Sequence, residues 1–443
     1  MPGPDERADR IVGVLRDAFI DLMEADPSAF RGKFRRMARD PFAFYRGTAC
    51  LFYADLGPDG PFAGADSRWV TGDGAEVWIQ GDLHAENFGT YLAADGRLVF
   101  DVNDFDEAYL GHWTWDLRRF VASLALLCWQ KALPDRVIDN LVGSYVRAYV
   151  EHVHHYVEVE DDTEWALTLA NGEGAVLDAL HLAKLRTRFA LLESVTVVES
   201  YRRRFADQQG VRRLDDAERA EVVAAFEAYQ ATIPDTKRSS RVIFDVLDVI
   251  GKTGFGIGSA GLPAYNVLIE GFNQALDNDV VLTIKQGNVA APSRVVTDER
   301  VRTFFDHHGH RTVLSQRALQ AHADRFLGWT TLRGQGFVVS EYSPYEQDLD
   351  WGELTEPADM EVLVRQLGRA TAKIHCVADD ESDQRLVTAS VEQVVSDSIG
   401  DDTEALVGDL VAFAHEYAAR ARADHGLFVD AFRGGAFARV APA

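Results

Sequence analysis

The sequence predicts an α+β protein with two lobes, one mostly helical and one a smaller antiparallel β lobe. Apolar residues recur at helical spacing over long stretches near both ends of the chain. Between them, residues 241–345 contain short β-branched runs separated by glycine-rich turns. We therefore expect three regions: residues 1–240, residues 241–345 and residues 346–443, the last adding helices to the first.

Composition excludes several classes of function. The chain has 443 residues, of which 47% are hydrophobic, so it can bury a sizeable core. Its net charge of −25 argues against a general nucleic-acid binder and against an anionic membrane surface as partner. The three cysteines are far apart and fit a reducing cytoplasm. With no apolar signal segment and no run of 18 apolar residues, a cytoplasmic location is expected. The oligomeric state stays open.

The N-terminal elements are predicted from apolar spacing. Residues 5–24 read as an amphipathic helix. Residues 31–39 are basic, which indicates a solvated helix face, with a phosphate contact as the alternative. The aromatic segment Pro41–Tyr53 is expected to pack on the loops that follow it. Further helices are expected at residues 117–131, 136–158, 298–326, 360–376 and 402–423.

Residues 78–120 form the most informative segment, because two strand-like runs each end there in a polar loop. The runs are Val77–Gln80 and Leu98–Val102. The loops carry Asp82, His84, Glu86 and Asn87 after the first run, and Asn103, Asp104, Asp106 and Glu107 after the second. Like charges so close repel each other unless a cation or a proton intervenes. Hard oxygen ligands of this kind suit Mg²⁺.

The spacing of these residues resembles known phosphotransferases. Asp82 and Asn87 are five apart, as in the catalytic loop of kinases. The segment resembles the loop of aminoglycoside and choline phosphotransferases, in which a second strand leads into a metal-binding loop and a helix. Asn103–Asp106 and Asp116–Leu117 occupy the corresponding places here.

A second resemblance covers most of the chain. From Pro41–Gly47 to the helix that ends at His375, the sequence is similar to DUF2252, a bacterial family of unknown function that is often grouped with the kinase-like folds. The resemblance thus implies a protein-kinase-like fold.

The kinase resemblance also implies roles for individual residues. Asp82 would orient or deprotonate an acceptor hydroxyl, and Asn87 and Asp104 would bind Mg²⁺ that bridges nucleotide phosphates. Asp106 is a possible second ligand, because it shares a side with Asp104 if the chain stays extended. Asp101 sits inside the strand, so we expect it to face the core or to pair with an arginine.

A glycine-rich motif lies within residues 241–271. Gly256, Gly258 and Gly261 form G-x-G-x-x-G between two strand-like runs. Strand, glycine loop and strand is the kinase arrangement, in which the loop covers the nucleotide phosphates. We expect the backbone of these glycines and of Ser259 to bind ATP. A plain glycine-rich hairpin is the alternative.

Lys285 ends the alternating run at residues 279–286, where kinases place the lysine that reaches the α- and β-phosphates. The alternative is a solvated edge residue, but the chain has only seven lysines. The helix expected at residues 298–326 offers no well-placed glutamate to pair with Lys285, which leaves its partner open. Strands are expected next, at Phe326–Trp329 and Gly336–Tyr342.

The order of these motifs differs from that of ordinary kinases. The catalytic loop comes near residue 82, whereas the nucleotide-binding signals lie at residues 251–345 and the helix that normally leads into the loop lies at residues 360–376. The sequence therefore predicts a circularly permuted kinase-like fold, which is possible because motif geometry, not chain order, defines a site.

Taken together, the motifs predict an ATP- and Mg²⁺-dependent phosphotransferase that acts on a hydroxyl of a small-molecule acceptor. One alternative is a nucleotide-binding pseudokinase with a regulatory role. A less favoured alternative is a metal-dependent phosphohydrolase that uses the same carboxylates with His84; otherwise His84 supports the loop by hydrogen bonding.

Overall fold

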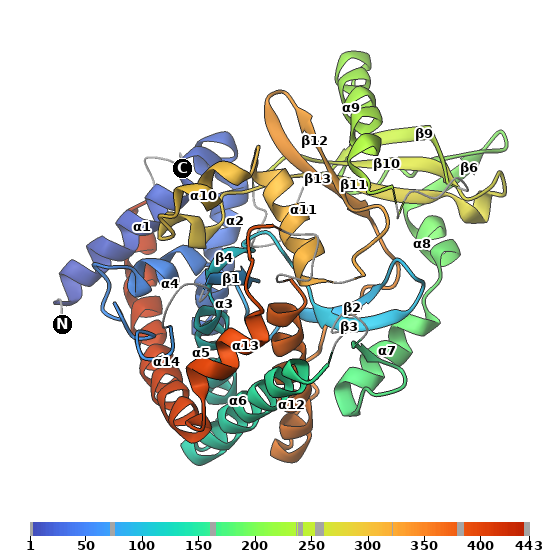
Figure 1. Cartoon of the computed structure of the whole chain (residues 1–443). Coiled ribbons are helices and arrows are strands. Elements are labelled where there is room, and N and C mark those ends of the chain that lie inside the picture. The colour runs from blue at the N-terminus through green and yellow to red at the C-terminus, as the bar shows by residue number, and fades with distance from the viewer. Residues whose placement is uncertain are drawn as a thin grey trace.

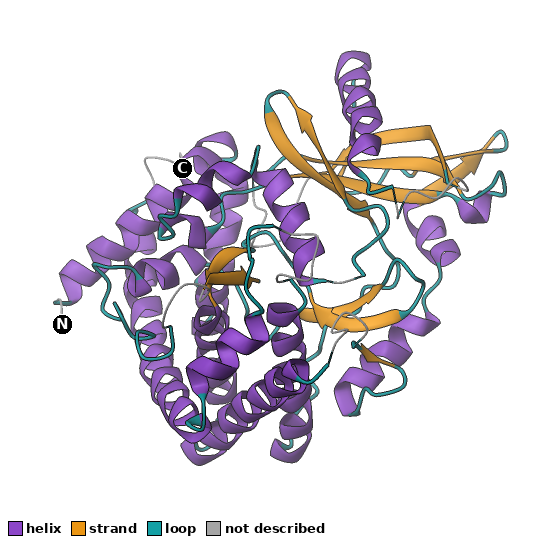
Figure 2. Ribbon diagram, in the orientation of Figure 1, coloured by secondary structure: helices purple, strands orange, loops and turns teal. Residues whose placement is uncertain are grey.

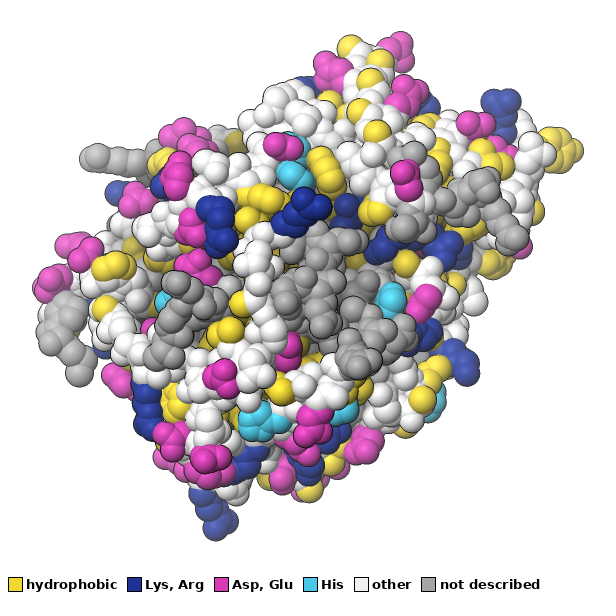
Figure 3. Space-filling view, in the orientation of Figure 1, with side chains coloured by type: hydrophobic (Ala, Val, Ile, Leu, Met, Phe, Trp, Pro, Cys, Tyr) yellow, Lys and Arg dark blue, Asp and Glu magenta, His cyan; other side chains and the backbone are white. Residues whose placement is uncertain are grey.

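The computed structural model describes residues 3–70, 76–159, 165–235, 237, 242–252, 261–320, 322–378 and 385–437. It is a mixed α+β structure with a large helical part on one side and an antiparallel sheet with its own helices on the other (Figures 1 and 2). Acidic side chains are scattered over the visible face and do not gather in one patch (Figure 3). No helix within the described ranges is long and apolar enough to cross a bilayer.

The helical part combines segments from both halves of the chain. Its helices are α1 (Pro4–Ala25), α2 (Pro27–Met37), α3 (Pro41–Arg46), α4 (Ala49–Leu56), α5 (Trp113–Gln130), α6 (Asp135–Val157), α7 (Gly174–Leu185), α12 (Pro357–Cys376), α13 (Val391–Ile399) and α14 (Thr403–Arg433). Local signals set several starts: Asp26 caps α2 and Asp40 caps α3, each followed by a proline. The apolar faces of these helices form one continuous core.

A six-stranded antiparallel sheet forms the β-rich part. In spatial order its strands are β12 (Gly328–Leu332), β13 (Gln335–Glu341), β11 (Val280–Gln286), β10 (Ala264–Gly271), β9 (Ile243–Lys252) and β8 (Val211–Arg213). Helix α9 (Asp216–Tyr229) buries Phe226 and Tyr229 against one face of the sheet. Helices α8 (Arg188–Val195) and α11 (His308–Leu319) contact strands of the sheet, whereas α10 (Glu299–Phe304) buries Val301 in the core of the helical part.

Three small sheets complete the structure. Strand β1 (Glu76–Ile79) pairs with β4 (Tyr109–His112). Strand β3 (Leu98–Val102) pairs with β2 (Phe88–Leu92) and β5 (Leu167–Thr168). Strands β6 (Thr196–Glu199) and β7 (Arg202–Phe205) form a hairpin. The polar loops after β1 and β3 thus come from two different sheets.

Most expected elements are present, and the differences have local causes. The helix expected at residues 298–326 is two helices, because the His307 side chain accepts a hydrogen bond from the His310 N–H and starts α11 anew. The strand expected at Phe326–Trp329 lies two residues later, as β12. The described part of residues 160–240 contains four short strands that the sequence did not reveal, and one of them, β8, extends the large sheet.

One buried ion cluster joins elements from the two ends of the described chain. Arg7 of α1 donates to Asp55 of α4 at 2.6 and 2.7 Å and to Asp424 of α14 at 2.6 and 3.0 Å. All three side chains are nearly inaccessible to solvent. The cluster therefore fixes α1 and α14 to the same core.

Candidate active site

The loop after β1 is held by the first turn of α5. The buried carboxylate of Asp116 accepts hydrogen bonds from the backbone N–H of Gln80 at 2.7 Å and of Gly81 at 2.9 Å. Gly81 has φ +81°, and a Cβ there would lie 2.1 Å from the Glu107 carbonyl oxygen, so the turn requires glycine. Fixing these two amides places the next residue, Asp82.

The side chain of Gln80 ties the loop after β1 to the loop after β3. Its Oε1 accepts from the Asp82 N–H at 2.8 Å, and its Nε2 donates to the Asp104 carbonyl oxygen at 2.6 Å. Asp104 has φ +55°, a left-handed backbone that aspartate tolerates better than most residues. Sparsely populated backbone conformations cluster at functional sites, so we take the turn as a mark of one.

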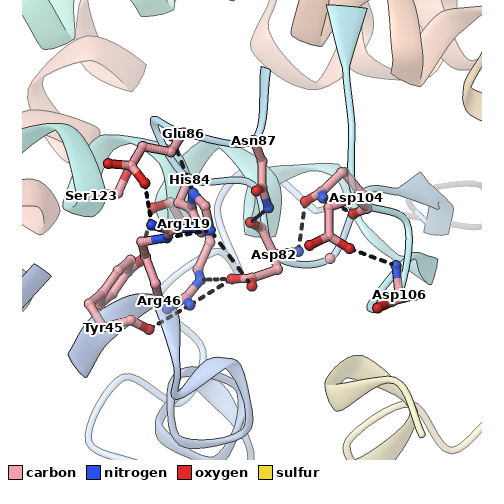
Figure 4. Close-up of polar contacts among 12 residues, drawn as sticks. Tyr45, Arg46, Asp82, His84, Glu86, Asn87, Asp104, Asp106, Arg119 and Ser123 are labelled. Carbon is pink, nitrogen blue, oxygen red and sulfur yellow. Dashed lines mark hydrogen bonds and ion pairs between the residues drawn. The ribbon is translucent and has the colours of Figure 1, made fainter. Parts of the chain in front are cut away.

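Asp82 forms an ion pair with Arg119 of α5, which the sequence did not predict (Figure 4). Arg119 Nε lies 2.8 Å from Asp82 Oδ1, and the guanidinium carbon lies 3.8 Å from the Tyr45 ring centre. Burial raises the pKa of Asp82 to about 6, although the charge of Arg119 opposes the shift. The carboxylate can therefore both lose and take up a proton near neutral pH.

The supporting role of His84 agrees with its contacts. Its Nδ1 accepts a hydrogen bond from the Glu86 N–H at 3.2 Å, within the loop itself. Burial, with Arg46 and Arg119 nearby, lowers the pKa of His84 well below its ordinary value, so the ring is neutral. Arg46 forms an ion pair with Glu86, which fixes the outer edge of the loop (Figure 4).

The three expected Mg²⁺ ligands lie on the loops that Gln80 joins. The Nδ2 of Asn87 donates to the Asp82 carbonyl oxygen at 2.9 Å, and the Asp106 N–H lies 3.4 Å from Asp104 Oδ1. Among the described residues, no group of three or more acidic, histidine or cysteine side chains could hold a metal alone. Mg²⁺ at phosphate sites takes one or two carboxylates together with phosphate oxygens, and Asp104 and Asp106 fit that pattern.

Asp101 lies outside this group, as expected. It is buried in β3 and forms an ion pair with Lys373 of α12, where the sequence had suggested either a core position or an arginine. Lys373 also donates to the Leu319 carbonyl oxygen at 3.0 Å. The pair therefore fastens α12 to β3 and α11.

Lys285 of β11 lies against the loop after β3. Its ammonium forms an ion pair with Asp106, 179 residues away in sequence. Burial acts to lower the pKa of Lys285, but the charges of Asp106 and Asp104 outweigh it and raise the pKa. Lys285, Asn87, Asp104 and Asp106 line the same cavity of about 450 Å³, so this partly exposed lysine lies at the same site as the acidic loop.

The glycine-rich motif can be placed in part. Gly256, Gly258 and Ser259 lie outside the described residues. Strands β9 and β10 flank that segment and pair in antiparallel register, with Lys252 opposite Ala264. Gly261 has φ +83°, and a Cβ there would lie 3.2 Å from the Leu22 carbonyl oxygen. Its contact with a nucleotide stays a prediction.

A second, smaller cavity of about 40 Å³ adjoins Asp82. Lys33 lines it and is 3% exposed, so the expectation of a solvated helix face for residues 31–39 is wrong for this lysine. Arg119 was missed as well, although it follows Asp116 by three residues and therefore shares its helix face. Neither Lys33 nor Arg119 is part of a sequence motif with a characteristic spacing.

The fold and this site define an α+β protein with carboxylates on two loops facing a lysine of the large sheet. The profile of DUF2252, described as uncharacterized proteins conserved in bacteria, matches residues 25–431. The chain therefore belongs to the DUF2252 family. No curated protein and no solved structure matches it significantly.

Proposed function

We propose that this protein is an ATP- and Mg²⁺-dependent phosphotransferase that acts on a hydroxyl group of a small molecule. The main support is that Lys285 lines a cavity of about 450 Å³ together with Asn87, Asp104 and Asp106. A cationic strand residue and an acidic loop in the wall of a cavity of this size suit a nucleoside triphosphate with its metal.

Each group has a separate task in this proposal. The ammonium of Lys285 binds nucleotide phosphates as a point charge. Asn87, Asp104 and Asp106 hold Mg²⁺, which neutralises charge on the phosphates. In the absence of nucleotide, the ion pair with Asp106 keeps Lys285 directed into the cavity.

Asp82 receives the proton of the acceptor. The acceptor oxygen forms a bond to the γ-phosphorus, the bond between that phosphorus and the β–γ bridging oxygen breaks, and ADP leaves. The hydroxyl proton passes to the Asp82 carboxylate, whose pKa near 6 suits a base at neutral pH. Arg119 keeps the carboxylate oriented toward the acceptor.

The arrangement also supports a kinase-like, two-lobed and circularly permuted fold. In this proposal the helical part is the catalytic lobe and the six-stranded sheet is the nucleotide lobe. Helix α12 follows the sheet in sequence yet lies beside β1 and β3, with His375 Nε2 3.4 Å from Asp116. New chain ends between that helix and the loop at Asp82 would produce this order.

A nucleotide-binding pseudokinase is the second candidate. Helix α11 contains no glutamate, and Lys285 instead pairs with Asp106 in the loop after β3. Such a protein would bind nucleotide without consuming it.

The test separates binding from transfer. We expect Mg²⁺ and ATP together to raise the melting temperature, and the wild type to phosphorylate a member of a pool of hydroxylated metabolites, detected by mass spectrometry. Asp82→Asn should keep nucleotide binding and lower transfer by about 10²–10⁴-fold, because the amide cannot take the proton.

Asp95→Asn, in the exposed turn between β2 and β3, is the matched control and should behave as wild type. Nucleotide binding without any consumption would favour the pseudokinase. Absence of binding, or wild-type transfer by Asp82→Asn, would contradict the proposed phosphotransferase.

A further inference from the structure

We propose that the small cavity beside Asp82 binds an anionic group of the acceptor, a carboxylate or a phosphate. This inference rests on the proposed function and narrows its substrate class to hydroxylated acids and hydroxyalkyl phosphates. The cavity measures about 40 Å³, and a single water needs about 10–15 Å³ by the same measure. It therefore has room for one such group rather than for a whole substrate.

The first observation is an unpaired buried cation. Lys33 is 3% exposed, and its ammonium lies 4.0 Å from the Phe19 ring centre and 5.6 Å from that of Phe30. Within the described ranges it has no hydrogen bond or ion pair, yet it lines the cavity. Burying an ammonium without an anionic partner costs several kcal/mol. We therefore expect Lys33 to have a function that offsets this cost, such as binding an anion.

Lys33 keeps its charge at neutral pH. Burial lowers the pKa of Lys33 to about 8, while carboxylates such as Glu107 and Asp82 oppose the shift. Its neighbour Cys50, which also lines the cavity, stays a neutral thiol because burial raises the pKa of Cys50 to about 11. No thiolate therefore neutralises the ammonium.

The second observation is the charge balance of the cavity wall. Arg294 lines the cavity, and its guanidinium lies near the backbone oxygens of Asp17 and Ala18, at 3.5 and 3.3 Å, not near a carboxylate. Glu107 accepts from the Ala291 N–H and from neither cation.

Three other charges of the wall are already paired, whereas Asp104 and Glu107 form no ion pair among the described residues. Arg46 pairs with Glu86, Asp82 with Arg119, and Asp106 with Lys285. Lys33 and Arg294 thus remain as two cations without a carboxylate partner among the described residues that line the cavity.

The third observation is the position of the small cavity next to Asp82, the proposed base, and next to the large cavity. Asp82 and Lys33 line the small cavity, and Asp104, Asp106 and Arg46 line both it and the large one. An acceptor anchored through its anionic group at Lys33 would present a nearby hydroxyl to Asp82. The nucleotide phosphates would approach the same hydroxyl from the large cavity.

The experiment uses the full chain saturated with Mg²⁺ and a non-hydrolysable ATP analogue, so that the triphosphate site is filled. Inorganic phosphate and acetate are titrated separately, and apparent dissociation constants are taken from the melting temperature. We expect one of the two anions to bind at least ten-fold more weakly to Lys33→Met than to the wild type. Binding of phosphate would indicate hydroxyalkyl phosphates as acceptors, and binding of acetate would indicate hydroxylated carboxylic acids.

Two variants serve as controls. Lys184→Met, on the exposed face of α7, should bind as wild type, and Lys33→Arg should recover part of the affinity. Methionine keeps the length of lysine and suits the neighbouring phenylalanine rings; Lys33→Gln replaces it if the first variant does not fold.

The outcomes separate this inference from the proposed function. If the analogue binds but neither anion distinguishes wild type from Lys33→Met, the anion site is wrong and the phosphotransferase proposal stands. If the analogue does not bind, the proposed function fails. Among acceptors, phosphorylation of neutral sugars or amino alcohols in preference to hydroxy acids and hydroxyalkyl phosphates would also overturn the anion site.

Discussion

At Asp82, burial and a neighbouring cation act on the carboxylate in opposite directions. Burial disfavours the charged form, and Arg119 favours it. The pKa near 6 results from both effects. Removing Arg119 would therefore change the charge and the orientation of Asp82 together, which makes Arg119 a positioning residue for the proposed base.

Lys285 provides the sharpest test of the nucleotide site. Lys285→Ala should weaken binding of Mg²⁺-ATP at least ten-fold, measured by calorimetry, while the fold stays intact. Lys285→Arg should recover binding only in part, because a planar guanidinium has a different reach and geometry from an ammonium.

Lys184→Ala is the matched control for this charge, since that lysine is exposed on α7. Unchanged ATP affinity in Lys285→Ala would remove the main support for the proposed nucleotide site.

Motif spacing could predict some site residues and not others. Asp82, Asn87, Asp104 and Lys285 stand at fixed distances from strand ends, so the sequence alone suggested that they meet. Lys33 follows no such rule. Its burial depends on contacts with Phe19 of another helix, which the sequence of α2 does not contain.

At the scale of elements, α5 organises the site because it begins there. Asp116, in its first turn, satisfies two backbone N–H groups of the loop after β1. Asp116→Ala would leave both amides buried without partners, at about 1–3 kcal/mol each. We expect a loss of about 2–6 kcal/mol in unfolding free energy, measured by denaturant titration, and loss of phosphate transfer.

Asp135→Ala, in the exposed first turn of α6, is the control and should change stability by under about 1 kcal/mol. A stability of Asp116→Ala equal to that of the wild type would show that the loop after β1 does not depend on α5.

Elements with strong periodicity could be predicted, whereas short or interrupted ones could not. The alternating run that became β11 and the apolar face of α1 each specify their structure locally. Strand β8 has three residues and owes its place to pairing with β9, so nothing in its own sequence marks it. The break between α10 and α11 depends on a histidine cap, which is a weak signal.

At the scale of the whole molecule, the cluster of Arg7, Asp55 and Asp424 connects α1 to α14. Mutating it tests how much this connection contributes to stability. Arg7→Met leaves two carboxylates buried without their cation, so we expect a loss of about 3–5 kcal/mol in unfolding free energy. Arg35→Met, on the exposed face of α2, should have little effect.

Adding Asp55→Asn and Asp424→Asn to Arg7→Met should restore part of that stability, because the unpaired charges are then gone. If Arg7→Met alone is as stable as the wild type, the cluster does not fasten α1 to α14.

The same cluster can be completed only late in the synthesis of the chain in the cell. Arg7 and Asp424 are separated by 417 residues, which takes roughly 20–80 s to translate at about 5–20 residues per second. Arg7 can meet Asp55 early, but α1 waits for its second carboxylate until α14 emerges from the ribosome. During that interval the apolar face of α1 lacks its final partner and is exposed to chaperones and proteases.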